Sequence, residues 1–120
     1  MKQGTYKTGK EGEERAIQYL KAHGMKILTT NFRNRQGEID VVGFDKGYLV
    51  FVEVKYRRSE RAGTPESAVT VQKQKKICRL ADYYRYLYHY GENYPLRYDV
   101  VAVTDNRIVW YQNAFEHISR

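Results

Sequence analysis

Three charged residues, Asp40, Glu53 and Lys55, interrupt two otherwise apolar stretches, GEIDVVGF and LVFVEVKY. Carboxylate oxygens are the ligands that Mg²⁺ and Mn²⁺ prefer, and Mg²⁺ in particular needs only one or two protein carboxylates because it keeps several waters. Such an ion polarises a phosphoryl oxygen and lowers the pKa of a water, while a nearby ammonium stabilises developing negative charge. These residue types therefore predict hydrolysis of a phosphodiester with Mg²⁺ or Mn²⁺ as cofactor.

The apolar stretches around these charges predict a β-hairpin, with strands near residues 38–43 and 49–56. Because side chains alternate between the two faces of a strand, Glu53 and Lys55 share the face of Phe51. The two charges are therefore neighbours, on a face that an apolar residue also occupies.

The turn of this hairpin decides which residues oppose each other. A turn centred on residues 46–47 places Asp40 across from Glu53 and Glu38 across from Lys55, with Cβ atoms about 5 Å apart. Two carboxylates at this separation repel each other unless one is protonated or a cation lies between them. A bulge in either strand would change this register.

A third acid, Glu13, comes from a helix expected before the hairpin. Thr8 begins this helix with a capping box, and Gly24 ends it. Apolar residues recur between them on one helical face, at Ala16, Ile17 and Leu20. Glu13 lies on the same inward stripe, in the expected first turn, where the helix dipole would stabilise a carboxylate. It is placed to complete a metal site.

The rest of the chain predicts the elements that position these residues. Further strands are expected at residues 25–33, 97–103 and 107–111. A second helix begins between Thr64 and Thr70 and ends near Tyr90. Because this helix separates two groups of strands, we expect an α/β fold in which helices flank a mixed central sheet with at least one crossover, as a single domain over residues 1–120.

The overall composition favours a polyanionic partner. The chain has 21 Lys and Arg residues against 14 Asp and Glu, a formal net charge of +7, and such a field attracts nucleic acids. The one cysteine, Cys78, cannot form an internal disulfide, which indicates the reducing cytoplasm. Neither a signal peptide nor a run of about 18 apolar residues is recognisable, so we expect no membrane association.

The motifs also resemble a known family. EID, followed by twelve residues and EVK, is similar to the PD-(D/E)xK nuclease core. The wider set GKEGEERAIQYL, NFRNRQGEIDVV and VFVEVKYR resembles the YraN-like family of small bacterial proteins. Within the superfamily, the chain is similar to archaeal Holliday-junction resolvases. Ile39 stands where the name of the pattern has Pro, a residue without a chemical role.

This resemblance implies a restriction-endonuclease-like αβββαβ core and an endonuclease that acts on DNA. Asp40 and Glu53 would bind the metal, Lys55 would be the catalytic lysine, and Glu13 would match the helix-borne acid that supports the metal. The resemblance also implies branched or structured DNA as substrate, a role in DNA repair or recombination, and a homodimer, because a four-way junction has two-fold symmetry.

Basic residues flank the expected site and are candidates for phosphate contacts, although they could form only a solvated surface. They are Arg33, Arg35, Arg57, Arg58, Arg61, Lys73 and Lys76. Helical spacing divides the run YYRYLYHY between the core, with Tyr84, Leu87 and Tyr88, and the surface, with Tyr83, Tyr86 and Tyr90. An outward tyrosine row could stack single-stranded bases or form a dimer surface. Cys78 is expected to be a small helix residue without a redox role.

Each assignment has a structural alternative. Glu53 and Lys55 could form an exposed ion pair on an edge strand with Asp40 facing solvent, and Glu13 could be an ordinary first-turn acid. At the level of function, one alternative is a nucleic-acid-binding module that kept the fold without turnover. Another is an interaction protein whose tyrosine-rich helix docks a partner.

Overall fold

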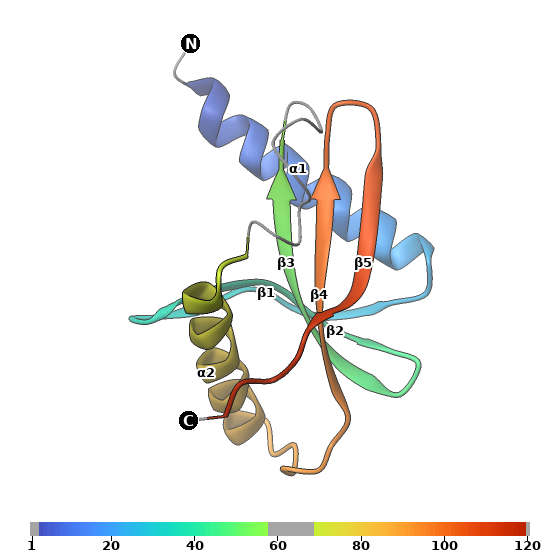
Figure 1. The fold of residues 1–120 in the computed structure, drawn as a ribbon. Coiled ribbons are helices and arrows are strands. Elements are labelled where there is room, and N and C mark those ends of the chain that lie inside the picture. The colour runs from blue at the N-terminus through green and yellow to red at the C-terminus, as the bar shows by residue number, and fades with distance from the viewer. Residues whose placement is uncertain (1–2, 58–68, 120) are drawn as a thin grey trace.

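The structure, a computed structural model, describes residues 3–57 and 69–119, and for residues 3–8 it describes the backbone alone. These residues form two helices and five strands in the order αβββαββ (Figure 1). The elements are α1 (Gln3–Ala22), β1 (Lys26–Asn34), β2 (Gly37–Asp45), β3 (Tyr48–Tyr56), α2 (Val71–Leu87), β4 (Leu96–Val103) and β5 (Ile108–Phe115). The expected α/β fold class is confirmed, and the arrangement is that of a restriction-endonuclease-like core.

The strands form one mixed sheet in the order β1-β2-β3-β4-β5. β3 and β4 are parallel and joined through α2, whereas the other neighbouring pairs are antiparallel. A parallel pair needs a long crossover, which explains why the second helix separates these two strands in the sequence. The consequence for the candidate site is that β3 lies in the centre of the sheet, with a neighbour on each side.

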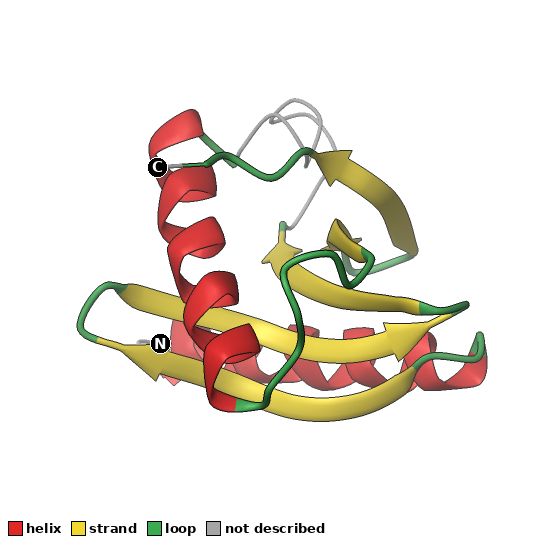
Figure 2. Ribbon diagram, turned by 90° about the horizontal axis from the view of Figure 1, so that it is seen from below, coloured by secondary structure: helices red, strands yellow, loops and turns green. Residues whose placement is uncertain are grey.

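The two helices cover opposite faces of this sheet (Figure 1, Figure 2). The core on the side of α2 includes Ile39, Val42, Phe51, Leu80 and Tyr84, and the core on the side of α1 includes Ala16, Leu20, Val41, Val50 and Val52. Alternation along β3 therefore sends Phe51 toward α2 and its two valine neighbours toward α1, as predicted. Cys78 lies in α2, as predicted, and is buried in the core on that side of the sheet. Within residues 3–57 and 69–119, no helix is long and apolar enough to cross a membrane.

α1 begins earlier than the sequence indicated. It starts at Gln3, so Thr8 lies inside the helix and the predicted capping box is wrong. The prediction followed the amphipathic pattern, which marks the buried part of a helix and not its exposed first turns. The predicted end is confirmed, because Gly24 adopts a left-handed conformation with φ = 101°, which glycine reaches without steric cost.

α2 begins after Thr70, one of its two predicted starts, and ends before Tyr90, its predicted end. Thr70 is the N-cap, and its side chain accepts a hydrogen bond from the backbone N–H of Lys73; Thr64 lies outside the described residues. The helix ends at Leu87, and His89 adopts a left-handed conformation with φ = 64°. The chain thereby turns back and packs Tyr90 against the core.

This early end corrects the predicted division of the tyrosine-rich run. Leu87 and Tyr88 are exposed, whereas Tyr90 packs against the core, so these three assignments are wrong. Helical spacing cannot be extended past the last helical residue, which explains the errors. Tyr84 is buried and Tyr83 and Tyr86 are exposed, as predicted.

Candidate active site

The site forms where β2 and β3 stop pairing as regular strands. The two strands pair in the predicted register as far as Val41 and Val52, and the next residues along each strand are Asp40 and Glu53. Asp40 Oδ2 accepts a hydrogen bond of 2.8 Å from the backbone N–H of Val54. The carboxylate of β2 thus takes the place of a backbone acceptor, which fixes Asp40 against β3.

Neither of the two predicted opposed pairs, Asp40 with Glu53 and Glu38 with Lys55, is among the paired residues of the two strands, because regular pairing stops at Val41 and Val52. Glu38 pairs instead with Arg33 of β1, and its carboxylate lies 3.6 Å from the Arg33 guanidinium. Glu38 therefore belongs to the β1–β2 side of the site.

Glu53 carries a buried carboxylate on the α2 side of β3, only 6% exposed. Its Oε2 atom lies 2.6 Å from Lys73 Nζ and 3.8 Å from Lys55 Nζ. Its Oε1 atom is buried and has no hydrogen-bond partner. The alternative of an exposed ion pair on an edge strand is therefore wrong, because β3 is the central strand and Glu53 is buried.

Asp40 and Glu53 line the same cleft, which has a volume of about 460 Å³. The wall on the side of α2 comes from the start of that helix, with Thr70, Gln72, Lys73, Lys76, Ile77 and Leu80. The two carboxylates therefore face a common space, flanked by basic side chains of a helix distant in sequence.

Burial and mutual repulsion dominate the electrostatics of this cleft. Burial, and then the charge of Glu53, raise the pKa of Asp40 to about 7, although the N–H of Val54 opposes this shift. Burial and the neighbouring Lys73 ammonium lower the pKa of Lys55. For Lys73, burial is outweighed by the hydrogen bond to Glu53, and the pKa is raised. Perturbed pKa values in a cleft are characteristic of functional sites.

A second cleft, of about 410 Å³, lies on the other side of Asp40 and also includes Glu13 and Glu38. Asn31, in a left-handed conformation with φ = 54°, donates hydrogen bonds to Glu13 at 2.8 Å and to Glu38 at 2.7 Å. Both acids raise the pKa of Asp40 through their charge. The structure thus brings Glu13 to the border of the predicted site.

The helix around Glu13 differs from the prediction in one respect. Because α1 begins at Gln3, Glu13 lies in the helix interior, and the expected stabilisation by the helix dipole does not apply. A close approach of α1 to β3 positions it instead: a Cβ atom on the preceding Gly12 would lie 3.2 Å from the ring of Tyr56. A larger residue at this position would push α1, and Glu13 with it, away from the sheet.

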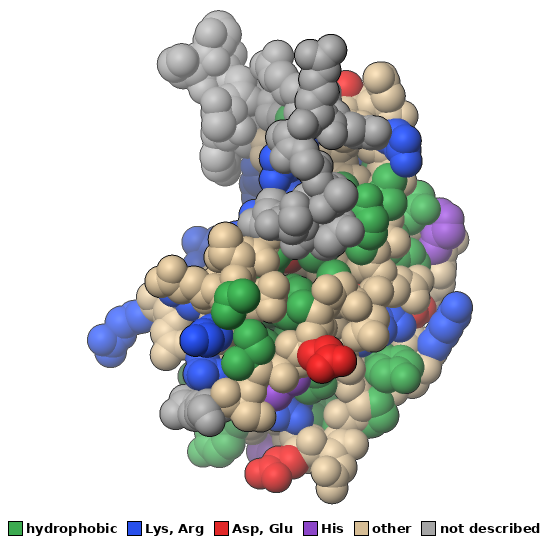
Figure 3. All heavy atoms as spheres, in the orientation of Figure 1, with side chains coloured by type: hydrophobic (Ala, Val, Ile, Leu, Met, Phe, Trp, Pro, Cys, Tyr) green, Lys and Arg blue, Asp and Glu red, His purple; other side chains and the backbone are tan. Residues whose placement is uncertain are grey.

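Lys and Arg side chains gather at the left of the view in Figure 3, over α2 and the tip of the β1–β2 hairpin. Of the predicted phosphate contacts, Lys73 and Lys76 line the first cleft and Arg33 lines the second. Arg35 is exposed in the turn between β1 and β2. Lys73, Lys76 and Arg33 therefore flank the acidic pair, and Arg35 lies at the hairpin tip.

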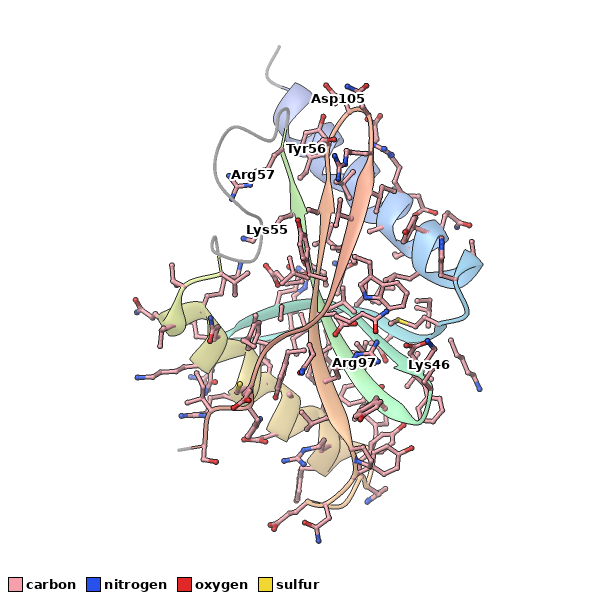
Figure 4. The ribbon with its side chains drawn as sticks, turned by 45° about the vertical axis from the view of Figure 1, so that its right-hand side comes forward. Lys46, Lys55, Tyr56, Arg57, Arg97 and Asp105 are labelled. Atoms are coloured by element: carbon pink, nitrogen blue, oxygen red, sulfur yellow. The ribbon has the colours of Figure 1, made fainter. Side chains whose placement is uncertain are left out.

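Three further predicted phosphate contacts follow β3. Arg57 and Lys55 both project toward the left of the view in Figure 4, in keeping with their spacing of two residues. Arg58 and Arg61 lie outside the described residues. The structure therefore adds Arg57 to the basic residues near the site and does not bear on the other two.

A metal at this site would find two carboxylates and not three. In the described part of the chain, no group of three or more His, Cys, Asp or Glu side chains is arranged to hold a metal ion. Two carboxylates suffice for Mg²⁺, which keeps several of its waters. The unpartnered Oε1 of Glu53 and the raised pKa of Asp40 fit a place that a cation would stabilise. The role of Glu13 in supporting a metal stays a prediction.

A second buried charge cluster was missed from the sequence. Arg97 of β4 contacts Asp45 and Asp99 at 2.9 Å each, and Asp99 also accepts hydrogen bonds from Trp110 Nε1 and from the backbone N–H of Asn113. The sequence contains a pattern that could have predicted this cluster: Arg97 and Asp99 are two residues apart in an apolar strand and share one of its faces, as Glu53 and Lys55 do.

Comparison with known proteins gives a consistent assignment over most of the chain. A sequence model of the Uncharacterised protein family UPF0102 matches residues 12–103. A UPF0102 protein of Thermodesulfovibrio yellowstonii is 46% identical over 107 residues, covering 89% of this chain and 94% of the relative. One from Lachnoclostridium phytofermentans is 46% identical over 104 residues, covering 87% and 88%. One from Legionella pneumophila is 35% identical over 114 residues, covering 93% and 97%. The resemblance to the YraN-like family is thereby confirmed, and this chain belongs to the UPF0102 (YraN) family.

Proposed function

We propose that this protein is a cytoplasmic, Mg²⁺- or Mn²⁺-dependent endonuclease that hydrolyses phosphodiester bonds of DNA. One observation carries the proposal: Asp40 and Glu53 face the same cleft, and an oxygen of Glu53 is buried there without a partner. A buried carboxylate oxygen without a partner costs free energy unless a ligand supplies one. Lys55, 3.8 Å from Glu53, completes the set of side chains expected for this chemistry: two carboxylates for the metal and one ammonium beside them.

Asp40 and Glu53 would hold the metal ion, with Glu13 supporting Asp40 from the second cleft. When bound, Mg²⁺ or Mn²⁺ supplies a Lewis acid that polarises a phosphoryl oxygen and lowers the pKa of a water. Asp40 is held for this role by the N–H of Val54, which bonds one of its oxygens. Before a metal binds, Glu53 is held by the two lysine ammonium groups near its Oε2 atom.

The remaining charges of the chain act on the nucleic acid. The Lys55 ammonium would orient the attacking water and stabilise negative charge as it develops on the phosphate. Lys76 and Arg33 line the clefts on the two sides of Asp40, so a phosphodiester at Asp40 would have cations toward both neighbouring phosphates. Such contacts position a backbone and carry no sequence information.

We further propose structured or branched DNA as the substrate, with a homodimer as the acting form. The family resemblance supports this choice, because similar resolvases act on four-way junctions and need two-fold symmetry. The basic side chains around the clefts favour recognition of backbone and shape over bases. Arg35 at the tip of the β1–β2 hairpin is a candidate for a contact outside the cleft.

Cleavage assays test the proposal. Purified protein is incubated with linear, nicked and four-way-junction DNA in Mn²⁺ or EDTA, beside the variants Asp40→Asn, Lys55→Ala and Glu92→Gln. Glu92 is an exposed acid after α2, so its substitution is the matched control for loss of an acidic residue. We expect metal-dependent cleavage that falls by at least ~100-fold in the first two variants and is unchanged in the third. Cleavage that persists in Asp40→Asn would exclude this site.

A DNA-binding module without turnover is the second candidate. The observation that favours it is the ion pair between Lys73 and Glu53 at 2.6 Å, which neutralises the buried acid with a protein cation. A module of this kind would bind DNA with a salt dependence set by its phosphate contacts; about five of them predict a log-log slope near −4.5. Salt-dependent binding of each DNA without cleavage in Mn²⁺ would favour this candidate.

A further inference from the structure

Lys73 is the cation closest to the buried carboxylate of Glu53. Its Nζ atom lies 2.6 Å from Glu53 Oε2, whereas Lys55 Nζ lies 3.8 Å from the same atom. The sequence motif around β3 contains Lys55 alone, because Lys73 comes from another element. The residue that neutralises Glu53 most directly is therefore outside the motif.

The backbone position of Lys73 is fixed by the start of α2. Thr70 caps the helix and accepts a hydrogen bond of 3.1 Å from the backbone N–H of Lys73, while Ile77 and Leu80, further along, are buried in the core. The ammonium is carried by a stem of four methylene groups with several rotatable bonds. The helix can therefore stay in place while the Lys73 side chain moves.

The exposure of the three charged side chains indicates which of them can move. The Glu53 side chain is 7% exposed and that of Lys55 is 22% exposed, whereas that of Lys73 is 41% exposed. Glu53 and Lys55 belong to the central strand β3 and are largely covered, but Lys73 lines the cleft and is the most exposed of the three. Withdrawal of its ammonium into water requires no change in the sheet.

The charges in and beside the cleft are balanced without an added ion when its acids are ionised. Lys73 and, beside the cleft, Lys55 lie within 4 Å of Glu53 and provide two positive charges against the negative charges of Asp40 and Glu53. Glu38 and Lys76, which also line the cleft, add one charge of each sign. A divalent cation added to this balanced set would be repelled by a Lys73 ammonium that stayed 2.6 Å from Glu53. The same cation would be accepted if that ammonium left, because Glu53 Oε2 would be freed beside the unpartnered Oε1.

We propose that Lys73 is an exchangeable counter-ion of the cleft. Its ammonium occupies the position at Glu53 that a divalent cation takes, and it leaves this position when the cation binds. After leaving, the ammonium lies at the cleft border beside Lys76, where it can contact a phosphate of the substrate. The site is thus kept neutral and folded before the metal arrives, and metal binding releases a cation toward the nucleic acid. This inference rests on the proposed function, since it requires metal binding by Asp40 and Glu53.

The affinity for Mn²⁺ without DNA tests this exchange. Isothermal titration calorimetry compares the wild type with Lys73→Gln, which keeps a hydrogen-bond donor but removes the competing charge. Lys76→Gln is the matched control: Lys76 lines the same cleft one turn later, and no ion pair joins it to Glu53 among the described residues. Lys73→Arg keeps the charge and offers two parallel donors to the carboxylate, a stronger interaction than that of an ammonium.

Lys73→Gln is expected to bind Mn²⁺ at least ~10-fold more tightly than the wild type, Lys76→Gln within ~3-fold of it, and Lys73→Arg several-fold more weakly. If Lys73→Gln does not fold, the weaker binding of Lys73→Arg carries the test alone. Equal Mn²⁺ affinities in the wild type and all variants would overturn the exchange and leave the nuclease proposal standing. No Mn²⁺ binding by any of the proteins at millimolar concentration would overturn both.

Discussion

Two clusters of buried charge lie on the same sheet and differ in how completely their hydrogen bonds are satisfied. Figure 4 shows Arg97 in the lower half of the view, near Lys46 and the β2–β3 turn, and Lys55 in the upper half, near the end of β3. Around Arg97, the carboxylate of Asp99 accepts hydrogen bonds from Arg97 Nε, Arg97 Nη2, Trp110 Nε1 and the backbone N–H of Asn113. In the cleft, Glu53 Oε1 accepts none.

The surroundings of the two clusters also differ: those of Arg97 stabilise its charge, whereas those of Asp40 disfavour its charge. The rings of Tyr48 and Trp110 lie 5.5 and 6.0 Å from the Arg97 guanidinium carbon and shield the ion pairs. The hydrogen bonds to Asp99 and Asp45 outweigh the effect of burial, so the pKa of Arg97 is raised and the group stays charged. The cleft instead holds an acid, Asp40, whose pKa is raised to about 7.

The comparison teaches how a structural cluster of charge can be told from a functional one. Burial alone does not distinguish them, since Asp99 and Glu53 are 1% and 6% exposed. Completeness of hydrogen bonding does, because a buried group left without a partner costs free energy unless a ligand supplies one. By this criterion Arg97 and Asp99 hold the sheet together, and Asp40 and Glu53 are arranged for a ligand.

Substitution of Asp99 should produce the largest effect on stability. Asp99→Asn removes a charge from a fully paired cluster and places an amide N–H₂ among groups that all donate. We expect the free energy of unfolding to fall by ~3–5 kcal/mol, as for other broken buried pairs. Urea unfolding followed by circular dichroism measures this change.

Glu53→Gln is the matched comparison for that experiment. It removes one negative charge and frees the ammonium groups of Lys55 and Lys73, which are 22% and 41% exposed and can be hydrated in place, so we expect a change within ~1 kcal/mol of the wild type. Should Glu53→Gln cost as much as Asp99→Asn, the proposed distinction between the clusters would fail, and Glu53 would be a structural residue.

The second-largest effect should be a pH dependence of stability that comes from Asp40 in the cleft. Burial and the charge of Glu53 raise the pKa of Asp40 from its ordinary value of 3.8 to about 7 in the folded chain. The folded state therefore keeps a proton that the unfolded state loses between pH ~4 and ~7. Stability therefore falls as pH rises through this window, by at most ~1.4 kcal/mol per pH unit. Asp40→Asn abolishes this contribution, and it keeps an acceptor for the N–H of Val54.

The measurement is the difference in urea unfolding free energy between Asp40→Asn and the wild type, at pH 4.5 and pH 7. Between pH 4.5 and pH 7, we expect the unfolding free energy of Asp40→Asn to rise by ~2 kcal/mol relative to that of the wild type. Parallel pH profiles of the two proteins would show that Asp40 titrates normally. The carboxylates of the cleft would then be too well solvated to need a cation.

The hairpin is the part of the site that sequence reasoning could predict. Lys46 and Gly47 both adopt positive φ angles, 53° and 87°, as a two-residue hairpin turn requires. This local turn determines the register, and alternation then decides which face each side chain of β3 occupies. The prediction that Asp40 and Glu53 stand together depended only on these two short-range rules.

Contacts between distant elements could not be predicted in this way. The ion pair of Lys73 with Glu53 depends on how α2 docks on the sheet, and no local pattern encodes that distance. The same holds for the contact of Arg97 with Asp45, which joins β4 to the end of β2. The sequence contains equivalent signals for both clusters, and only the packed fold shows which one is fully paired.

Within the Arg97 cluster, the smallest effect should come from removing a single bond at its edge. Trp110→Phe deletes the hydrogen bond of 2.8 Å to Asp99 Oδ2 and keeps most of the aromatic surface beside Arg97. Because three donors to Asp99 remain, we expect a loss of ~1 kcal/mol, measured by circular dichroism because the variant lacks the only tryptophan of the chain. A loss as large as that of Asp99→Asn would mean that the cluster depends on one bond. Completeness of pairing would then be the wrong criterion for assigning the cluster a structural role.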